Sequence, residues 1–219
     1  MRKLPAGTLA LAGARSYSPV MAKKADPTAR IVDAALALAA RDGWRTVSLA
    51  AIAAEARIDV LGLYSVFPSK AAILDAFHRR IDAAALAGGP PEAEERPRDR
   101  LFDVIMRRFD ALGPYKKAIA AIARDALADP LVTLCSVPTL LNSMTWMLEA
   151  SGVSASGWVG RVRSKLLLGI YLSVLRVWLA DDSADMTTTM ATLDARLRLA
   201  ERWLGLASAG SERPAPAPG

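Results

Sequence analysis

Histidine and cysteine are almost absent from the 219-residue chain, which has one of each, His78 and Cys135. One cysteine cannot form an internal disulfide, and these two residues cannot supply the four ligands of a structural zinc ion. Any catalytic triad or dyad built on histidine would depend on His78 alone. We therefore expect no catalytic residue, no metal site and no cofactor, and a protein that is not an enzyme.

Long uncharged apolar runs are also missing. The longest apolar run, 166–175, is bounded by Lys165 and Arg176, whereas a membrane-spanning helix needs about 20 apolar residues. The N-terminal run 8–14 is broken by Gly13 and is shorter than a secretory core, although its surroundings weakly resemble an organelle-targeting segment. We expect a cytoplasmic protein.

The positive charge is unevenly distributed. Of the formal net charge of +6, most belongs to the first 30 residues, which hold six basic side chains and one acidic one. We predict a flexible basic arm over 1–25, which either contacts phosphates or anionic lipid or stays solvated. Met21, within this arm, is a second possible translation start besides Met1.

Strand-like alternation is absent, and Ala, Leu, Arg and Met dominate, so we predict an all-α fold. Proline and glycine fall between the periodic runs rather than within them. Polar caps and prolines mark the expected helix starts, and glycines mark several ends. The expected helices cover 27–43, a segment from 48, a segment from 59, 69–87, 101–112, 114–129, 130–149, 156–180 and 185–206.

A Gly- and Pro-rich break, 88–97, divides the chain. We predict a small module with its connecting helix over 26–87, a larger helical domain over 98–207, and a disordered tail over 208–219.

The last two predicted helices are the most apolar. One side of the first carries Trp158, Val162, Leu166, Ile170, Val174 and Val177, and the second carries Met186, Met190, Leu193, Leu197 and Leu204. Such stripes suit either a core or a dimer interface, and we expect a homodimer that a charge at Leu197 would disrupt.

Several charged pairs look like ordinary surface groups. We expect Arg107–Arg108 and Lys116–Lys117 on the polar faces of their helices, solvated or paired, and Asp181–Asp182 solvated in a loop.

Residues 52–70 carry a helix–turn–helix pattern. Two short helices meet at a tight turn over 56–58, and the second has the geometry that enters a DNA major groove. Their expected internal packing set is Ile52, Ala53, Ile58, Leu63 and Phe67.

This segment resembles the N-terminal motif of the TetR family of transcriptional repressors. The resemblance is carried by Ala34-Ala35-Leu36, Gly43, Ile52-Ala53, Leu63-Tyr64, Phe67 and Ser69-Lys70. It implies a TetR-like fold: a three-helix DNA-binding module, a helical ligand-binding and dimerisation core of about six helices, and a homodimer through the last two helices. The DNA-binding residues expected on this basis are Arg45, Ser48, Arg57, Val60, Leu61, Gly62, Tyr64 and Lys70, with Ser48, Tyr64 and Lys70 at phosphate-contacting positions.

The motif departs from the family pattern at its turn and on its reading helix. Arg57 replaces the usual glycine, which predicts a strained left-handed backbone unless the turn is reshaped. Val60, Leu61 and Gly62 cannot hydrogen-bond a base edge through their side chains. Methyl contacts and backbone groups are what remain for direct readout.

The C-terminal half also resembles the lipid-binding accessory family of coenzyme Q biosynthesis, which shares the TetR fold. Its markers are Tyr171, Trp178, Asp181, Ser183, Asp185, Leu193 and Asp194. This resemblance implies an alternative function, an isoprenoid- or lipid-binding accessory protein with a degenerate helix–turn–helix and a possible membrane-surface partner.

Aromatic and methionine side chains recur in the larger domain. Bulky, flexible side chains either pack an ordinary core or line an adaptable apolar pocket, and both resembling families hold an apolar ligand between these helices. The candidate ligand-binding residues are Phe102, Met106, Phe109, Met144, Met147 and Tyr171, with Trp146 near them. The favoured hypothesis is a DNA-binding repressor controlled by a small apolar ligand.

Overall fold

The computed structural model describes residues 26–89, 95–128 and 130–206, except for the side chains of 127 and 130–135. The predicted arm 1–25 and tail 208–219 lie outside the described residues, as do residues 90–94 of the predicted linker.

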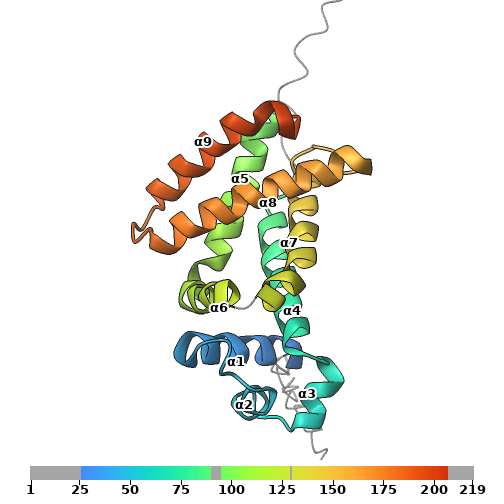
Figure 1. The fold of residues 1–219 in the computed structure, drawn as a ribbon, viewed down its shortest axis with the longest axis vertical. Helices are drawn as coiled ribbons and strands as arrows, with labels where there is room; N and C mark the ends of the chain where they lie inside the picture. Colours follow the sequence, from blue (N-terminus) through green and yellow to red (C-terminus); the bar gives the residue numbers. More distant parts are fainter. Residues whose placement is uncertain (1–25, 90–94, 129, 207–219) are drawn as a thin grey trace, which may run out of the picture.

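The described residues form helices with short connections and contain no strand, which confirms the all-α prediction (Figure 1). In chain order the elements are α1 (Pro27–Asp42), α2 (Leu49–Glu55), α3 (Val60–Val66), α4 (Lys70–Leu86), α5 (Pro97–Leu112), the 3₁₀ turn η1 (Gly113–Tyr115), α6 (Lys116–Ala128), α7 (Pro130–Ala150), α8 (Gly157–Ala180) and α9 (Thr187–Leu204).

The first three helices form a small module at one end of the molecule, and α5 to α9 form the larger body (Figure 1). The predicted helix starts are confirmed by side-chain caps: the carboxylates of Asp26 and Asp59 and the hydroxyls of Ser48 and Ser69 each accept a backbone N–H from the first turn. The predicted packing set is confirmed, with Ile52, Ala53, Leu63 and Phe67 buried and Ile58 packed against them.

Two contacts join the module to the body. Helix α4 follows α3 directly and packs against α1 on one side and against α5 and α7 on the other. Helix α1 also packs against α6 (Figure 1). The module is therefore held at two places, through α4 and through the α1–α6 contact.

The prediction that proline stays outside the helices is wrong at one position. Pro138 lies inside α7. A proline in a helix interior costs about 3 kcal/mol. Helix α7 packs against α4, α5, α6 and α8, and this tertiary packing outweighs the local penalty.

The predicted apolar stripe on α8 is only partly correct. Ile170 and Val174 face the core of the chain, whereas Trp158 and Val162 are exposed. Each step of four residues overshoots a full helical turn by about 40°, so a stripe built from such steps winds around the helix. The large apolar residues that share an outward face of α8 are Trp158, Val162 and Leu172.

The most unexpected feature of the body is a buried arginine. Arg108 is 0% exposed, so the prediction that it lies on the polar face of its helix is wrong, although it is paired. It lies seven residues after Leu101, two helical turns along the same buried stripe of α5. The side chain therefore points into the core and needs partners there.

Polar side chains from three other helices surround this guanidinium. Arg108 forms an ion pair with Asp82 of α4, and its Nε lies 3.3 Å from the hydroxyl of Tyr171 in α8. The second oxygen of Asp82 accepts a hydrogen bond of 2.6 Å from the Ser143 hydroxyl of α7. The Arg108 Nη2 also lies 3.4 Å from Nδ1 of His78.

The histidine of this cluster is neutral at pH 7. Burial, followed by the positive charge of Arg108, lowers the pKa of His78 from 6.5 to about 4, and Asp75 opposes this shift. A neutral imidazole can accept the Arg108 hydrogen bond at Nδ1.

The prediction that Asp181 is solvated is also wrong. Asp181 is buried, and its two carboxylate oxygens accept hydrogen bonds from the backbone N–H and hydroxyl groups of Ser183 and Thr189. These hydrogen bonds lower the pKa of Asp181. The carboxylate therefore organises the turn into α9, a role that a pair of adjacent acids in a loop does not reveal.

We predict that Asp82→Asn lowers the free energy of unfolding by about 3–5 kcal/mol, because it leaves the Arg108 guanidinium buried and uncompensated. Urea unfolding followed by circular dichroism measures the change. The double variant Asp82→Asn/Arg108→Met removes the orphaned charge and should recover part of the loss. A single variant no less stable than the double variant would contradict a compensating role for the ion pair.

Candidate nucleic-acid interface

The turn between α2 and α3 is built as the sequence predicted. The Ile58 N–H donates to the carbonyl of Ala53 at 3.0 Å, which closes the turn, and Arg57 has φ 55°. A non-glycine residue in the left-handed region costs roughly 1–2 kcal/mol. The turn keeps its geometry and tolerates this strain, with the Arg57 side chain exposed.

The outward face of α3 is apolar. Leu61 is 72% exposed, Tyr64 is 66% exposed, and Val60 lies beside them with 55% exposure. Leu63 and Phe67 on the opposite face are buried against α2 and α1. The module therefore presents two aliphatic side chains and a phenol ring to the outside.

Two polar side chains at α3 are bonded within the helix. The Asp59 carboxylate accepts the Gly62 N–H at 2.8 Å, and the Ser65 hydroxyl donates to the Gly62 carbonyl at 2.8 Å. A Cβ at position 62 would lie 2.6 Å from Oδ1 of Asp59, so a larger residue there would require the Asp59 side chain to shift.

The loop before α2 carries two of the predicted interface residues. Ser48 caps α2 through its hydroxyl oxygen, and its O–H remains able to donate. The Arg45 side chain is exposed, and its backbone N–H donates to the Asp125 carboxylate of α6 at 2.8 Å. This bond ties the loop to the body, a link that neither residue type nor spacing indicated.

Lys70 holds the same loop from the other side. Its Nζ donates to the carbonyls of Trp44 and Val47, both at 2.6 Å, and lies 4.4 Å from the Trp44 ring centre. Burial lowers the pKa of this ammonium, and Asp125 opposes the shift. Lys70 therefore has a structural role besides the phosphate contact expected from the sequence.

The six candidate ligand-binding residues come together in the body. Met106, Phe109, Met144, Met147 and Tyr171 are buried, and Phe102 is half-buried against the same core. The ring of Phe109 stacks on Tyr171 at 5.4 Å, next to the Arg108 cluster. Trp146, by contrast, is exposed at the surface.

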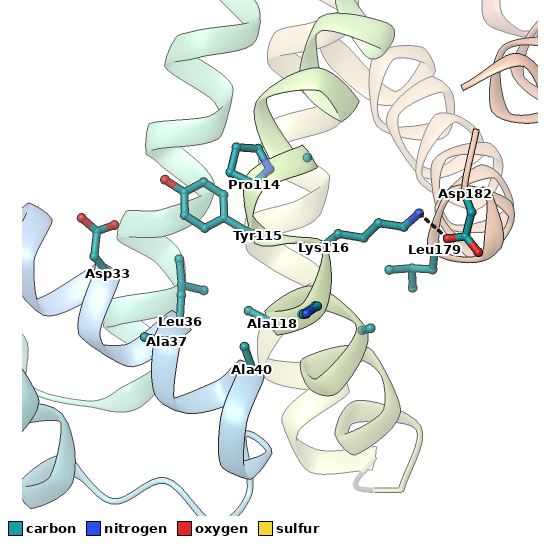
Figure 2. A pocket seen from close by; sticks show the side chains of 13 residues that line it. Asp33, Leu36, Ala37, Ala40, Pro114, Tyr115, Lys116, Ala118, Leu179 and Asp182 are labelled. Atoms are coloured by element: carbon teal, nitrogen blue, oxygen red, sulfur yellow. Dashed lines mark ion pairs between the residues drawn. The ribbon is translucent and has the colours of Figure 1, made fainter. Parts of the chain in front are cut away.

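A groove of about 870 Å³ runs between α1 and the start of α6 (Figure 2). Leu36, Ala37 and Ala40 of α1 form one wall, and Lys116 reaches across the other wall toward Asp182, with the ion pair at 3.8 Å. None of the six candidate ligand-binding residues lines it.

A clasp of three side chains lies beside this groove, and two of its members, Asp33 and Tyr115, line it. Arg80 of α4 donates to Asp33 of α1 at 2.7 Å, and its guanidinium stacks over the ring of Tyr115, 5.1 Å from the ring centre. The clasp joins the module, the connecting helix and the body at one point. Because its members come from 33, 80 and 115, no sequence window could have predicted it.

The described part of the chain holds no group of three or more His, Cys, Asp or Glu placed to bind a metal. In the same residues, no single helix is long and apolar enough to cross a membrane. Among these residues, only the pair α3–α4, bent by 54°, reaches the length and apolar composition of a membrane span when its two helices are taken together.

We predict that Lys70→Met lowers the free energy of unfolding by about 1–3 kcal/mol, because two carbonyl oxygens lose their shared donor. Thermal and urea unfolding measure the change. Lys117→Met, at an exposed lysine, is the matched control and should stay within about 0.5 kcal/mol of the unmodified chain. Equal stability of the two variants would show that the Lys70 contacts do not support the loop.

Residues 31–77 match the family model for bacterial regulatory proteins, tetR family. The HTH-type transcriptional repressor KstR of Mycolicibacterium smegmatis is 40% identical over 70 residues, which cover 28% of this chain and 34% of that protein. The chain thus spans about a third of the length of this curated relative. The resemblance to the accessory family of coenzyme Q biosynthesis is not confirmed by these relatives.

The whole fold also has solved counterparts. A TetR transcriptional regulator from Nitrosomonas europaea aligns with a TM-score of 0.65 at 24% identity, over 81% of this chain and 99% of that one. A TetR transcriptional regulator from Rhodococcus sp. RHA1 aligns with a TM-score of 0.60 at 19% identity, over 84% and 97%. The chain therefore carries the N-terminal domain of the TetR family on a body that has the TetR fold.

Proposed function

We propose that the protein is a DNA-binding transcriptional repressor that works as a homodimer in the cytoplasm and responds to a small apolar ligand. The observation that carries this proposal is α3, which stands exposed on a tightly packed helix–turn–helix whose sequence matches the TetR family. The match to a relative named as a transcriptional repressor supports repression of transcription rather than activation.

The DNA contacts are assigned to groups around α3. Arg45 and Arg57 are exposed cations on either side of α2, and Ser48 retains its hydroxyl donor. An ammonium has three donors, so Lys70 keeps one for a phosphate after its two carbonyl bonds. Contacts of this kind position a protein on the duplex and make its affinity depend on salt.

Dimerisation is assigned to the outer faces of α8 and α9. These helices pack against each other, and their outward surface holds large apolar side chains that stay exposed in the described chain. They are Trp158, Val162, Leu172, Leu199 and Trp203. A second copy that buries them would place two modules side by side, as a palindromic site requires.

Ligand control is assigned to the body around the Phe109–Tyr171 stack. An apolar molecule that enters there must displace packed side chains beside Arg108, whose partner Asp82 lies on α4. Helix α4 continues to the module, so a change at Asp82 reaches α3 through one rigid element. Ligand and DNA then bias the same two-state element, and their effects on each other are reciprocal.

The direct experiment is a DNA-binding titration. The full chain selects duplexes from a random library of about 30 base pairs, and the affinity for the selected sequence is measured between 50 and 200 mM salt. We expect specific binding that weakens by about 10³-fold or more over this range if six or more phosphates are contacted. Val60→Asp should abolish binding, whereas Ala84→Asp, at an exposed site on α4, should not. Failure to enrich any sequence with folded protein would contradict the proposed function.

For the dimer, the sequence-based choice of Leu197 needs correction. Leu197 is 0% exposed within one chain, so a charge there would unfold the protein rather than separate two copies. Leu199, two residues on, is 77% exposed. We predict that Leu199→Glu gives a folded monomer, because a carboxylate buried at an apolar interface costs several kcal/mol.

Light scattering after gel filtration at micromolar concentration measures the state, and circular dichroism checks the fold. Arg198→Glu, at the neighbouring exposed site, is the control and should remain dimeric. An unmodified chain that is already monomeric at micromolar concentration would refute the assignment.

A further inference from the structure

The apolar outward face of α3 raises the question of how this protein distinguishes one DNA sequence from another. Base pairs are usually read by hydrogen bonds from Arg, Lys, Asn, Gln, Asp or Glu to base edges in the major groove. Helix α3 has no such residue between Val60 and Val66. The inference below rests on the proposed DNA-binding function and concerns its specificity.

The remaining polar groups near the start of α3 are committed to the helix itself. The Asp59 carboxylate and the Ser65 hydroxyl are both bonded to Gly62, as described above. Gly62 has no side chain, and a Cβ there would press on Oδ1 of Asp59. Tyr64 has a free hydroxyl, which lies at the position expected for a phosphate contact.

The groups that do project outward are methyl-bearing. Leu61 is the most exposed large apolar side chain of the helix, and Val60 stands next to it. An exposed aliphatic pair on a reading helix has one complementary feature in the major groove, the C5-methyl group of thymine. The exposed cations Arg45 and Arg57 on the same module favour a polyanion rather than an apolar protein surface as the occupant of this face.

We propose that Leu61 and Val60 read thymine methyl groups, so that the protein selects its site by the positions of thymines. Each contacted methyl is then worth about as much as one buried CH₂ group, or about fourfold in affinity. A homodimer that repeats the contact in two half-sites gains about 15-fold from one methyl in each.

The experiment uses the duplex that the full chain selects from the random library. Each thymine is replaced in turn by deoxyuridine, which lacks only the methyl group. We expect about fourfold weaker binding at one or two thymines in each half-site and no change at thymines outside the contacted region. Replacing a critical T·A pair by 5-methylcytosine·G should retain more affinity than replacing it by C·G, because the methyl group is kept.

A matched variant identifies the protein partner. In Leu61→Ala the deoxyuridine effect at the contacted thymine should disappear, because the side chain that meets the methyl is gone. Leu61 is exposed, so this variant keeps the fold, and circular dichroism checks it. Val60→Ala, combined with deoxyuridine in the same way, provides an independent test for a thymine that contacts Val60 instead of Leu61.

The outcomes separate the two proposals. Specific DNA binding that is insensitive to deoxyuridine at every position would overturn the thymine-methyl reading, would leave the DNA-binding function intact and would assign readout to other groups such as Arg57. Absence of any selected DNA would overturn both. In that case, binding of the chain to phosphatidylglycerol vesicles that is lost in Leu61→Asp would assign the apolar face of α3 to a membrane surface.

Discussion

The Arg108–Asp82 ion pair is the interaction around which the body is arranged. A guanidinium cannot lose its proton, so wherever α5 places Arg108 in the core, an acid and further acceptors must lie beside it. Those partners come from α4, α7 and α8, which limits how these helices can slide or rotate relative to one another. Burying two charges is costly, and an apolar core of the same volume can be more stable. The pair is therefore better understood as fixing one arrangement of four helices than as a source of net stability.

The same pair has a consequence for control. Asp82 lies near the end of α4 that packs in the body, and Lys70 lies at the end that holds the loop of the small module. The second connection lies beside α1: Arg80 of α4 pairs with Asp33 of α1 and stacks over Tyr115, and the backbone N–H of Arg45 donates to Asp125 of α6. A movement of the helices in the body is therefore transmitted to the small module through two connections. Charged and polar contacts of this kind have few intermediate arrangements, which is a physical basis for a two-state response.

Local sequence rules predicted the parts of the fold that depend on local physics. The caps at Asp26, Ser48, Asp59 and Ser69 follow from residue type and position, and they are confirmed. The left-handed Arg57 and the outward-facing Val60 and Leu61 were predicted from the resemblance to the TetR family, and the structure has both features.

The missed features are those that join distant segments or depend on exact helix phase. The Arg80–Asp33 clasp and the Arg45–Asp125 bond join residues 47 and 80 positions apart, so no local pattern marks them. Arg108 was missed because a charged residue was assigned to the polar face, although its seven-residue spacing from Leu101 placed it on the buried stripe. The four-residue stripe on α8 ignored the helix period, which mixed core side chains such as Ile170 with surface ones such as Trp158.

The central claim is that α3 contacts DNA and that α4 joins this contact to the polar centre of the body. Amide hydrogen exchange of the full chain with and without its selected duplex tests both parts in one measurement. The account predicts slower exchange in α2 and α3 and, beyond the DNA contact itself, along α4 as far as Asp82. Protection that is confined to the outer faces of α8 and α9, with no change in α3, would contradict it.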